Sequence, residues 1–420
     1  MPRLFVRTLG CPKNEYDSEV YAGLFASAGW ILVDSPARAD MVLLNTCAFI
    51  APAVDESMEA VAAALEWKRR KPGRRLALTG CLPGRFPDDG SGGLEDFDFV
   101  TGPAAEREVA AWLRLPPARR PLARARPGPC RFLRISDGCD NRCAYCTIPL
   151  IRGRFVPEST EAVLARAGEL VEQGALEIGV VAQDTGMWRS GATGLTGLVE
   201  RLSDRWRDTW FRIYYLHPAH IPGDLVGLIE DRENVMPWLD LPVQHASDRI
   251  LSRMGRPYTR ADLERLVNRV SASSREIAMR ITVMTGYPGE EDSDFEELSG
   301  FLKGAGPLKT LVAFRYSPEE GTLEHSRGGR AVPVGETDRR LAVIGDIASD
   351  ASLAWADRLL GRRIRVLVDD RFSGHSVWDA PEVDGACLFE RACRVGTLVD
   401  AVVEGCAGPD LFVTEAPPGN

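Results

Sequence analysis

The chain has 420 residues, of which 45% are hydrophobic, and a formal net charge of −9; this length predicts two or three domains with sizeable cores. The negative charge argues against a wide nucleic-acid-binding surface but is compatible with a local basic patch or with a basic protein partner. No apolar run approaches the roughly 18 residues that span a bilayer, the start of the chain lacks the features of a secretory signal, and ten cysteines without an export signal favour metal ligation over disulfides, so we expect a cytoplasmic protein.

Three apolar, strand-like runs near the start of the chain each lead to a cysteine. These cysteines are Cys11, Cys47 and Cys81, and the intervals of 36 and 34 residues between them match a strand–helix–strand unit. Such alternation predicts a parallel sheet covered by helices. Because ligands gather at the carboxyl ends of the strands in such sheets, we expect the three thiols to meet at one edge as a metal site. The alternative for each cysteine alone is an ordinary buried thiol.

Residues 114–130 form a proline- and arginine-rich segment that we interpret as an extended, semi-rigid linker between domains. Its charge suits either contact with RNA or packing along acidic neighbours.

The run SDGCDNRCAYC places Cys139, Cys143 and Cys146 in one short loop. The spacing Cys-x3-Cys-x2-Cys is too tight for a paired zinc finger. A cubic four-iron cluster normally takes four thiolates, so three local ligands leave either a distant fourth ligand or one iron open to a small molecule. The preceding strand-like residues and the ring of Tyr145 favour the open iron. A structural zinc knuckle or three free thiols are the alternatives.

From about residue 131 to 315, strand and helix patterns alternate about six times, which predicts a partial β/α barrel rather than a closed eight-stranded one. The expected strands are Arg131–Ser136, Leu176–Ala182, Phe211–Leu216, Trp238–Leu241, Arg280–Thr285 and Thr310–Tyr316, and a helix is expected over Ser159–Gln173.

Four residues that follow strands of this barrel are candidate binding residues. Gln183 and Asp184 come where barrel active-site groups lie, although they also suit a cap of the next helix. Gly286 and Gly289 allow close approach of the backbone to a ligand, and a plain Pro-Gly turn explains them as well.

From about residue 358 to 417, short strands separated by turn residues predict a small all-β barrel. This segment holds seven arginines and ten acidic residues, a net charge of −3. Because an RNA-binding barrel is expected to be basic, we expect this one to dock a basic protein.

Longer motifs resemble a known family over nearly the whole chain. The run SDGCDNRCAYCTIPLIRG resembles the methylthiotransferase branch of the radical S-adenosylmethionine (SAM) superfamily, and TLGCPKNEYDSE and NTCAFI resemble the amino-terminal domain of that branch. VAQDTGMW, GYPGEEDSDF, YSPEEGT and DAPEVDG resemble the enzymes that modify an aspartate of ribosomal small-subunit protein twelve. The resemblance implies an α/β chain with a parallel amino-terminal domain (1–113), a linker (114–130), a partial (β/α)6 radical SAM domain (131–350) and a carboxyl-terminal TRAM-like β-barrel (358–417).

The same resemblance implies two 4Fe–4S clusters and SAM as cofactors. The open iron of the cluster on Cys139, Cys143 and Cys146 would bind SAM, whose cleavage gives a deoxyadenosyl radical. Cys11, Cys47 and Cys81 would hold the auxiliary cluster that carries the sulfur. Candidate cofactor-binding residues are Tyr145, Gln183, Asp184, Gly286 and Gly289.

The activity implied is the insertion of a methylthio group at the β-carbon of an aspartate in the ribosomal protein. Expected partners are this basic protein, an electron donor such as flavodoxin or ferredoxin, and ribosomal RNA. Two alternatives are methylthiolation of isopentenylated adenosine in transfer RNA and a non-catalytic iron–sulfur carrier. Cys130, Cys387, Cys393 and Cys406 have no partner pattern and are interpreted as ordinary thiols.

Overall fold

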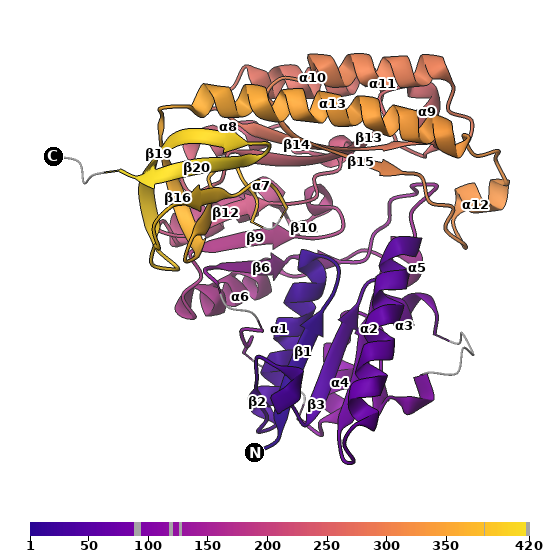
Figure 1. Ribbon diagram of the computed structural model, residues 1–420, viewed down its shortest axis with the longest axis vertical. Coiled ribbons are helices and arrows are strands. Elements are labelled where there is room, and N and C mark those ends of the chain that lie inside the picture. The colour runs from indigo at the N-terminus through magenta and orange to yellow at the C-terminus, as the bar shows by residue number, and fades with distance from the viewer. Residues whose placement is uncertain (88–93, 117–120, 126–127, 382, 417–420) are drawn as a thin grey trace.

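The computed structural model describes residues 1–87, 94–116, 121–125, 128–381 and 383–416. The amino-terminal part is a parallel sheet with the strand order β2-β1-β3-β4-β5 and helices on both faces (Figure 1). Its elements are β1 (Arg3–Thr8), α1 (Pro12–Ser27), β2 (Ile31–Leu32), η1 (Pro36–Arg38), β3 (Met41–Thr46), α2 (Ala51–Arg69), β4 (Arg75–Gly80), α3 (Cys81–Arg85), η2 (Leu94–Asp96), β5 (Phe99–Val100) and α4 (Glu106–Trp112).

Strand β3 explains why this sheet has two covered faces. Met41 and Leu43 lie in one core with residues of α1, whereas Val42 and Leu44 lie in a second core with residues of α2. Successive side chains of a strand point to opposite faces, so the uninterrupted apolar run of β3 fits a strand buried on both sides. The predicted parallel α/β architecture is confirmed.

The described part of the predicted linker packs on the protein. Leu122 is buried, and its carbonyl accepts a hydrogen bond from Gln173 at 2.8 Å. The Ala123 N–H donates to the Glu19 carbonyl of α1 at 3.1 Å. These contacts place the described part of the segment along α1 and beside Gln173; residues 117–120 and 126–127 of the segment lie outside the described residues.

The central part holds the six predicted barrel strands in two three-stranded parallel sheets, ordered β12-β9-β6 and β13-β14-β15. An isolated bridge from Phe211 to Val235 lies between the two sheets, and β6 and β15 are edge strands that do not pair with each other in the described structure, so the barrel is partial, as expected. The six strands are β6 (Cys130–Arg134), β9 (Glu177–Val181), β12 (Trp210–Ile213), β13 (Trp238–Gln244), β14 (Ala278–Thr285) and β15 (Leu308–Arg315).

Helices cover the outside of the partial barrel (Figure 1). The predicted helix at Ser159–Gln173 is α6, whose amino-terminal cap is Ser159: its hydroxyl accepts from the Ala162 N–H at 3.2 Å. The helices are α5 (Ile148–Arg152), α6 (Thr160–Glu172), α7 (Leu195–Arg205), α8 (Leu225–Asp231), α9 (Asp248–Arg253), α10 (Arg260–Ser271), α11 (Asp292–Gly304), α12 (Leu323–Arg327) and α13 (Val334–Leu359). Short elements between them are β7 (Ser136–Asp137), β8 (Val156–Pro157), η3 (Thr185–Met187), β10 (Arg189–Ser190), β11 (Thr193–Gly194) and η4 (Pro218–His220).

The carboxyl-terminal part is a closed five-stranded barrel in the order β16-β17-β18-β20-β19, as predicted. Its strands are β16 (Arg363–Asp370), β17 (Ser373–Ser376), β18 (Cys387–Phe389), β19 (Leu398–Ala407) and β20 (Asp410–Glu415). Its core is continuous with the central domain through Tyr214 and Trp238. The Trp238 Nε1–H donates to Asp384 at 2.8 Å, and Arg212 donates to the Val377 carbonyl at 3.0 Å. In the described parts of the chain, no helix is both long and apolar enough to cross a membrane.

The barrel surface carries a different charge from the one that the sequence count indicates. All seven arginines of the segment are exposed. Among the acidic residues, Asp379 is buried against Lys309, and the Asp384 side chain is buried against Arg280 at 3.4 Å. These two acidic side chains therefore fix the barrel to the central domain and do not contribute to a surface for a partner, which makes the described barrel surface less acidic than the net charge of −3 indicates.

Candidate active site

The first cysteine triad lies at one edge of the amino-terminal sheet. Cys11 precedes α1, Cys47 follows β3 directly, and Cys81 begins α3 directly after β4. Because β1, β3 and β4 are parallel neighbours, the three thiols come to the same edge, as predicted from the strand pattern.

Two glycines allow the backbone to turn there. Gly10 and Gly80 have φ angles of 95° and 98°. A Cβ at Gly10 would meet the Cys47 Cβ at 2.8 Å, and one at Gly80 would meet the Thr46 carbonyl oxygen at 2.4 Å. Glycine is required at both positions for conformation and for space.

The electrostatics favour a thiolate within this triad. A hydrogen bond from Cys47 lowers the pKa of Cys81 to about 6, against the effect of burial, and the nearby Arg152 guanidinium lowers it further. The same hydrogen bond raises the pKa of Cys47. The lowered pKa of Cys81 favours the thiolate, which is the form that ligates metals.

The second triad lies in the loop between β7 and α5. Cys139 is held by a hydrogen bond from its N–H to the Gly153 carbonyl at 3.2 Å. The Ala144 N–H donates to the Met254 carbonyl at 2.8 Å. Burial raises the pKa of Cys139, and burial together with Cys143 raises the pKa of Cys146 to about 12. Raised pKa values for Cys139 and Cys146 fit a site where a multivalent metal group compensates the negative charge of the thiolates.

The donor sets fit clusters better than single ions. In neither triad do all three sulfur atoms lie within 4.8 Å of one another in the described structure, although two other groups of donors do. One tetrahedral ion requires such convergence. A cubic cluster binds each thiolate through a different iron, so its three ligands stand farther apart.

The side chain of Arg152 at the end of α5 connects the two triads. Its guanidinium donates to Asn14 Oδ1 at 2.8 Å and to Asp17 at 3.1 Å on α1, and to Asp137 at 2.9 Å beside the second loop. Arg134 of β6 also pairs with Asp17. The cationic residues of the central domain thus hold α1, which starts at Cys11, against the loop of the second triad.

Gln183 and Asp184 lie beyond the end of β9, beside the second triad. Asn141 of the cysteine loop donates to Asp184 Oδ2 at 2.7 Å, and His220 Nδ1 lies 2.6 Å from the same oxygen. Gln183 donates to Asp137 at 3.1 Å. The remaining oxygens, Gln183 Oε1 and Asp184 Oδ1, are buried without a hydrogen-bond partner in the described structure. These two acceptors have unused capacity for a ligand.

The other candidate binding residues have contacts of their own. The Tyr145 hydroxyl accepts from Arg256 at 2.6 Å, and its ring meets Tyr287 edge-on at 6.3 Å. Gly286 has a φ of 78°, and a Cβ there would meet the Thr337 side chain at 2.8 Å. Gly289 has a φ of 82°. Turn geometry and packing therefore account for both glycines in this structure.

Sequence reasoning missed Lys13 and Tyr215. Lys13, two residues after Cys11, is only 7% exposed, and its Nζ lies 3.5 Å from the centroid of the Tyr215 ring. Tyr215 follows β12 and has a φ of 58°, an unusual value for a residue with a side chain. For Lys13, the one signal in the sequence was its closeness to Cys11. The burial of Lys13 depends on Tyr215, which lies beyond the end of β12 and far away in the sequence.

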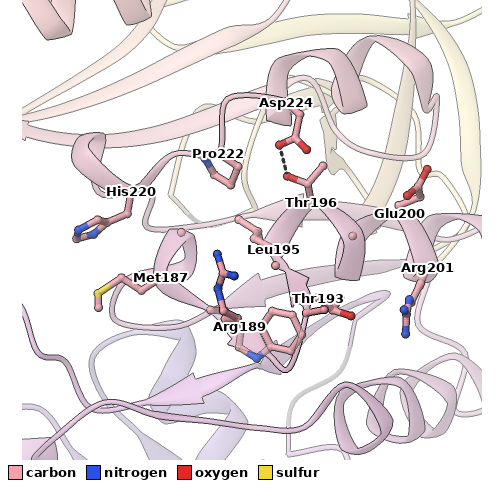
Figure 2. A pocket seen from close by; sticks show the side chains of 15 residues that line it. Met187, Arg189, Thr193, Leu195, Thr196, Glu200, Arg201, His220, Pro222 and Asp224 are labelled. Carbon is pink, nitrogen blue, oxygen red and sulfur yellow. Dashed lines mark hydrogen bonds between the residues drawn. The ribbon is translucent and has the colours of Figure 1, made fainter.

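A cavity of about 710 Å³ lies beside this site, and none of the six cysteines lines it. Figure 2 shows its mixed lining, with Arg189, Glu200 and Arg201 around the opening and a hydrogen bond from Thr196 to Asp224. His220 lies at its edge and connects it to Asp184.

Cys130, whose lack of a partner pattern suggested an ordinary thiol, has polar partners in the structure. Its Sγ lies 3.6 Å from Asp369 and 4.0 Å from His375 Nε2. His375 lies between Asp369 at 2.6 Å and Glu177 at 3.0 Å, and these carboxylates and Cys130 hold the pKa of His375 well above its usual value despite burial. The group joins the carboxyl-terminal barrel to the central domain.

Comparisons with known proteins place these sites in two families. Residues 3–102 match the model of the uncharacterized protein family UPF0004, and residues 133–302 match the radical SAM superfamily. The first range contains one triad and the second range contains the other.

Several curated proteins are similar over nearly their whole length. A protein of Desulfosudis oleivorans is 36% identical over 97% of this chain and 99% of its own, and one of Desulforudis audaxviator is 37% identical over 97% and 96%. One of Thermotoga maritima is 31% identical over 96% and 97%. Each is named ribosomal protein uS12 methylthiotransferase RimO.

Solved structures share the fold at low identity. The radical SAM methyltransferase TsrM of Kitasatospora setae, solved with cobalamin and a [4Fe–4S] cluster, matches with a TM-score of 0.57 at 17% identity over 79% of this chain and 80% of that one. The cobalamin-dependent enzyme OxsB matches with a TM-score of 0.51 at 12% identity over 82% and 56%.

Proposed function

The chain belongs to the RimO family of ribosomal protein uS12 methylthiotransferases, and on this premise we propose that it inserts a methylthio group at the β-carbon of an aspartate of uS12. The observation that carries the proposal is the pairing of two cysteine triads through Arg152 and α1. A reaction that both breaks an unactivated C–H bond and forms a C–S bond needs two such centres facing one substrate. A transfer-RNA substrate is not favoured, because the relatives are named for uS12.

The enzyme is a radical SAM transferase with SAM and 4Fe–4S clusters as cofactors. We propose Cys139, Cys143 and Cys146 as ligands of the SAM-cleaving cluster, and Cys11, Cys47 and Cys81 as ligands of the auxiliary one. When bound, these groups supply the electron that cleaves SAM and the iron at which the incoming sulfur is held. A radical route is required because no protein base removes so weakly acidic a proton.

The protein side chains orient the substrates. We assign Gln183 and Asp184 to polar groups of SAM, supported by their two buried acceptor oxygens that lack partners in the described structure. Tyr145, fixed by Arg256, would close the site beside the last ligand. We propose that the backbone at Gly286 and Gly289 lies against the adenine of SAM, and this proposal rests on the family pattern alone.

The same proposal includes a flavodoxin or ferredoxin as electron donor and a cytoplasmic location. It also includes the domain limits 1–113, 114–130, 131–350 and 358–417. Contact with ribosomal RNA is supported by Arg371, Arg391 and Arg394 of the barrel, which are exposed and form no ion pair with the described residues. The Cys393 N–H donates to the Arg371 carbonyl at 2.7 Å, which brings the loops of the three arginines together.

Anaerobic reconstitution tests the function directly. The enzyme, loaded with iron and sulfide, is incubated with SAM, a reductant and uS12, and mass spectrometry should find a methylthio group on one aspartate. Deoxyadenosine should form in proportion to the amount of modified uS12. Unchanged uS12 with modified transfer RNA would contradict the assignment, and the absence of deoxyadenosine would favour an iron–sulfur carrier.

A further inference from the structure

Lys13 is a buried residue whose ammonium group pairs with no acidic side chain in the described parts of the chain. The side chain is 7% exposed, and its contact is the face of the Tyr215 ring at 3.5 Å. No hydrogen bond or ion pair joins Lys13 Nζ to any described residue. A buried cation is costly unless a counter-charge compensates it, and a cation–π contact supplies only part of this compensation.

The nearby carboxylates already have partners. Asp240, whose charge acts on Lys13, accepts from Arg280 at 3.1 Å and from the Tyr215 N–H at 3.1 Å. Asp17, on the same helix as Lys13, is paired with Arg134 and with Arg152. Neither carboxylate is free to pair with Lys13, which leaves its ammonium group able to bind an anion from outside this chain, in addition to facing the charges of Cys11 and Cys81.

The position of the ammonium indicates which anion this is. Lys13 is close enough to Cys11 and Cys81 to interact with their charges. Tyr215, beneath the ammonium, lies at the end of β12, and its carbonyl accepts from the Thr185 N–H next to Asp184. Lys13 is thus close to Cys11 of the first triad along the chain and is connected, through Tyr215, to Thr185 and Asp184 beside the second triad. The positive φ of Tyr215 is the kind of backbone strain that persists at functional sites.

We propose that Lys13 binds the side-chain carboxylate of the target aspartate of uS12. This inference rests on the proposed function and adds the residue that recognises the substrate group. The reacting β-carbon is bonded directly to the carboxyl carbon, so one charge-assisted hydrogen bond to that carboxylate fixes the carbon beside both triads. A neutral asparagine of the same shape leaves the cation uncompensated, so the site selects aspartate.

The test compares intact uS12 with a uS12 variant whose target aspartate is replaced by asparagine. Both are titrated by fluorescence anisotropy against the reconstituted holoenzyme with SAM and without reductant, so that no turnover occurs. We expect the wild type to bind the aspartate form at least about tenfold more tightly. The Lys13→Met enzyme should bind both forms of uS12 with the affinity that the wild-type enzyme has for the asparagine form. The Lys13→Arg enzyme should still prefer the aspartate form. Lys303→Met, at an exposed lysine in the last turn of α11, is the control.

Three results would overturn the proposal. The first is an unchanged preference of the Lys13→Met enzyme for the aspartate form, and the second is the absence of this preference in the wild-type enzyme. The third is loss of iron or of SAM binding in Lys13→Met, because Lys13 would then be a counter-charge for a cofactor. Failure of the proposed function is distinguishable from these, because the wild type would then leave uS12 unmodified in the reconstitution assay.

Discussion

Cys47 and Cys143 belong to different triads, and their loss should have different effects. Cys143→Ala should abolish deoxyadenosine formation, whereas Cys47→Ala should still cleave SAM and yet transfer no methylthio group. In each variant the iron content should fall from about eight to about four atoms per chain. Iron analysis and product analysis by mass spectrometry measure both effects. Cys406→Ala, outside both triads, is the control. Equal loss of SAM cleavage in the two triad variants would show that the triads do not divide the chemistry.

The sequence was informative where a residue's role depends on local spacing. Cys139, Cys143 and Cys146 are recognisable within one loop, and Cys11 is recognisable because a strand precedes it. Lys13 and Asn141 were missed because their roles depend on partners brought together only by folding: the Tyr215 ring for Lys13, and Asp184 for Asn141. A lysine that is buried after folding has the same local sequence pattern as an exposed one.

Helix α1 and strand β6 form the contact that sets one triad against the other. Asp17 of α1 is 2% exposed and pairs with two arginines of the central domain, Arg134 and Arg152. Removal of one partner from a buried ion pair leaves an uncompensated charge and costs about 3 to 5 kcal/mol. Asp17→Asn removes the buried partner that Arg134 and Arg152 share and leaves Asp137 as the one carboxylate that the described structure pairs with both.

We therefore expect Asp17→Asn to lower the melting temperature of the cluster-free protein by several degrees, as followed by circular dichroism. Glu66→Gln is the matched control, because the Glu66–Arg70 pair is 64% and 69% exposed and such pairs contribute about 0 to 1 kcal/mol. If the two variants melt alike, the arginines on β6 and α5 do not hold the amino-terminal domain in place.

Element prediction succeeded where hydrophobic periodicity is strong. All six barrel strands and α6 were found, with ends that differ by a few residues. The bounds of β12 differ most: the predicted strand ran to Leu216, and the observed strand ends at Ile213. The backbone leaves the sheet at Tyr215, whose carbonyl and N–H bond to Thr185 and Asp240 instead. Apolar pattern alone does not reveal such a departure, because Leu216 is buried whether or not it pairs.

At the scale of the whole molecule, the charge of the carboxyl-terminal barrel changes meaning once the fold is known. The sequence count gave a net charge of −3 and suggested a dock for a basic protein. The structure buries the Asp379 and Asp384 side chains against the central domain and leaves the arginines exposed. A composition count cannot separate acidic residues that fix one domain to another from those that face a partner.

The exposed arginines make a prediction about which form of uS12 the enzyme modifies. Arg371, Arg391 and Arg394 stand on adjoining loops, and Phe372 beside them is 52% exposed. Arginines with an exposed aromatic ring are suited to contact with RNA phosphates and bases. If the barrel contacts ribosomal RNA, the triple variant Arg371→Gln, Arg391→Gln, Arg394→Gln should modify free uS12 at the wild-type rate and assembled small subunits several-fold more slowly.

The salt dependence separates this effect from a general loss of activity. Each phosphate contact contributes to the slope of the logarithm of affinity against the logarithm of salt concentration, so the variant should show a smaller slope with assembled subunits and an unchanged one with free uS12. A triple variant of equal charge change on the amino-terminal domain, Arg38→Gln, Arg69→Gln, Arg107→Gln, should match the wild type on both substrates. Two outcomes would exclude the RNA contact. If the barrel variant slows modification of free uS12 and of assembled subunits equally, the three arginines act on the protein substrate. If it slows neither, they contact nothing that the assembled subunit adds.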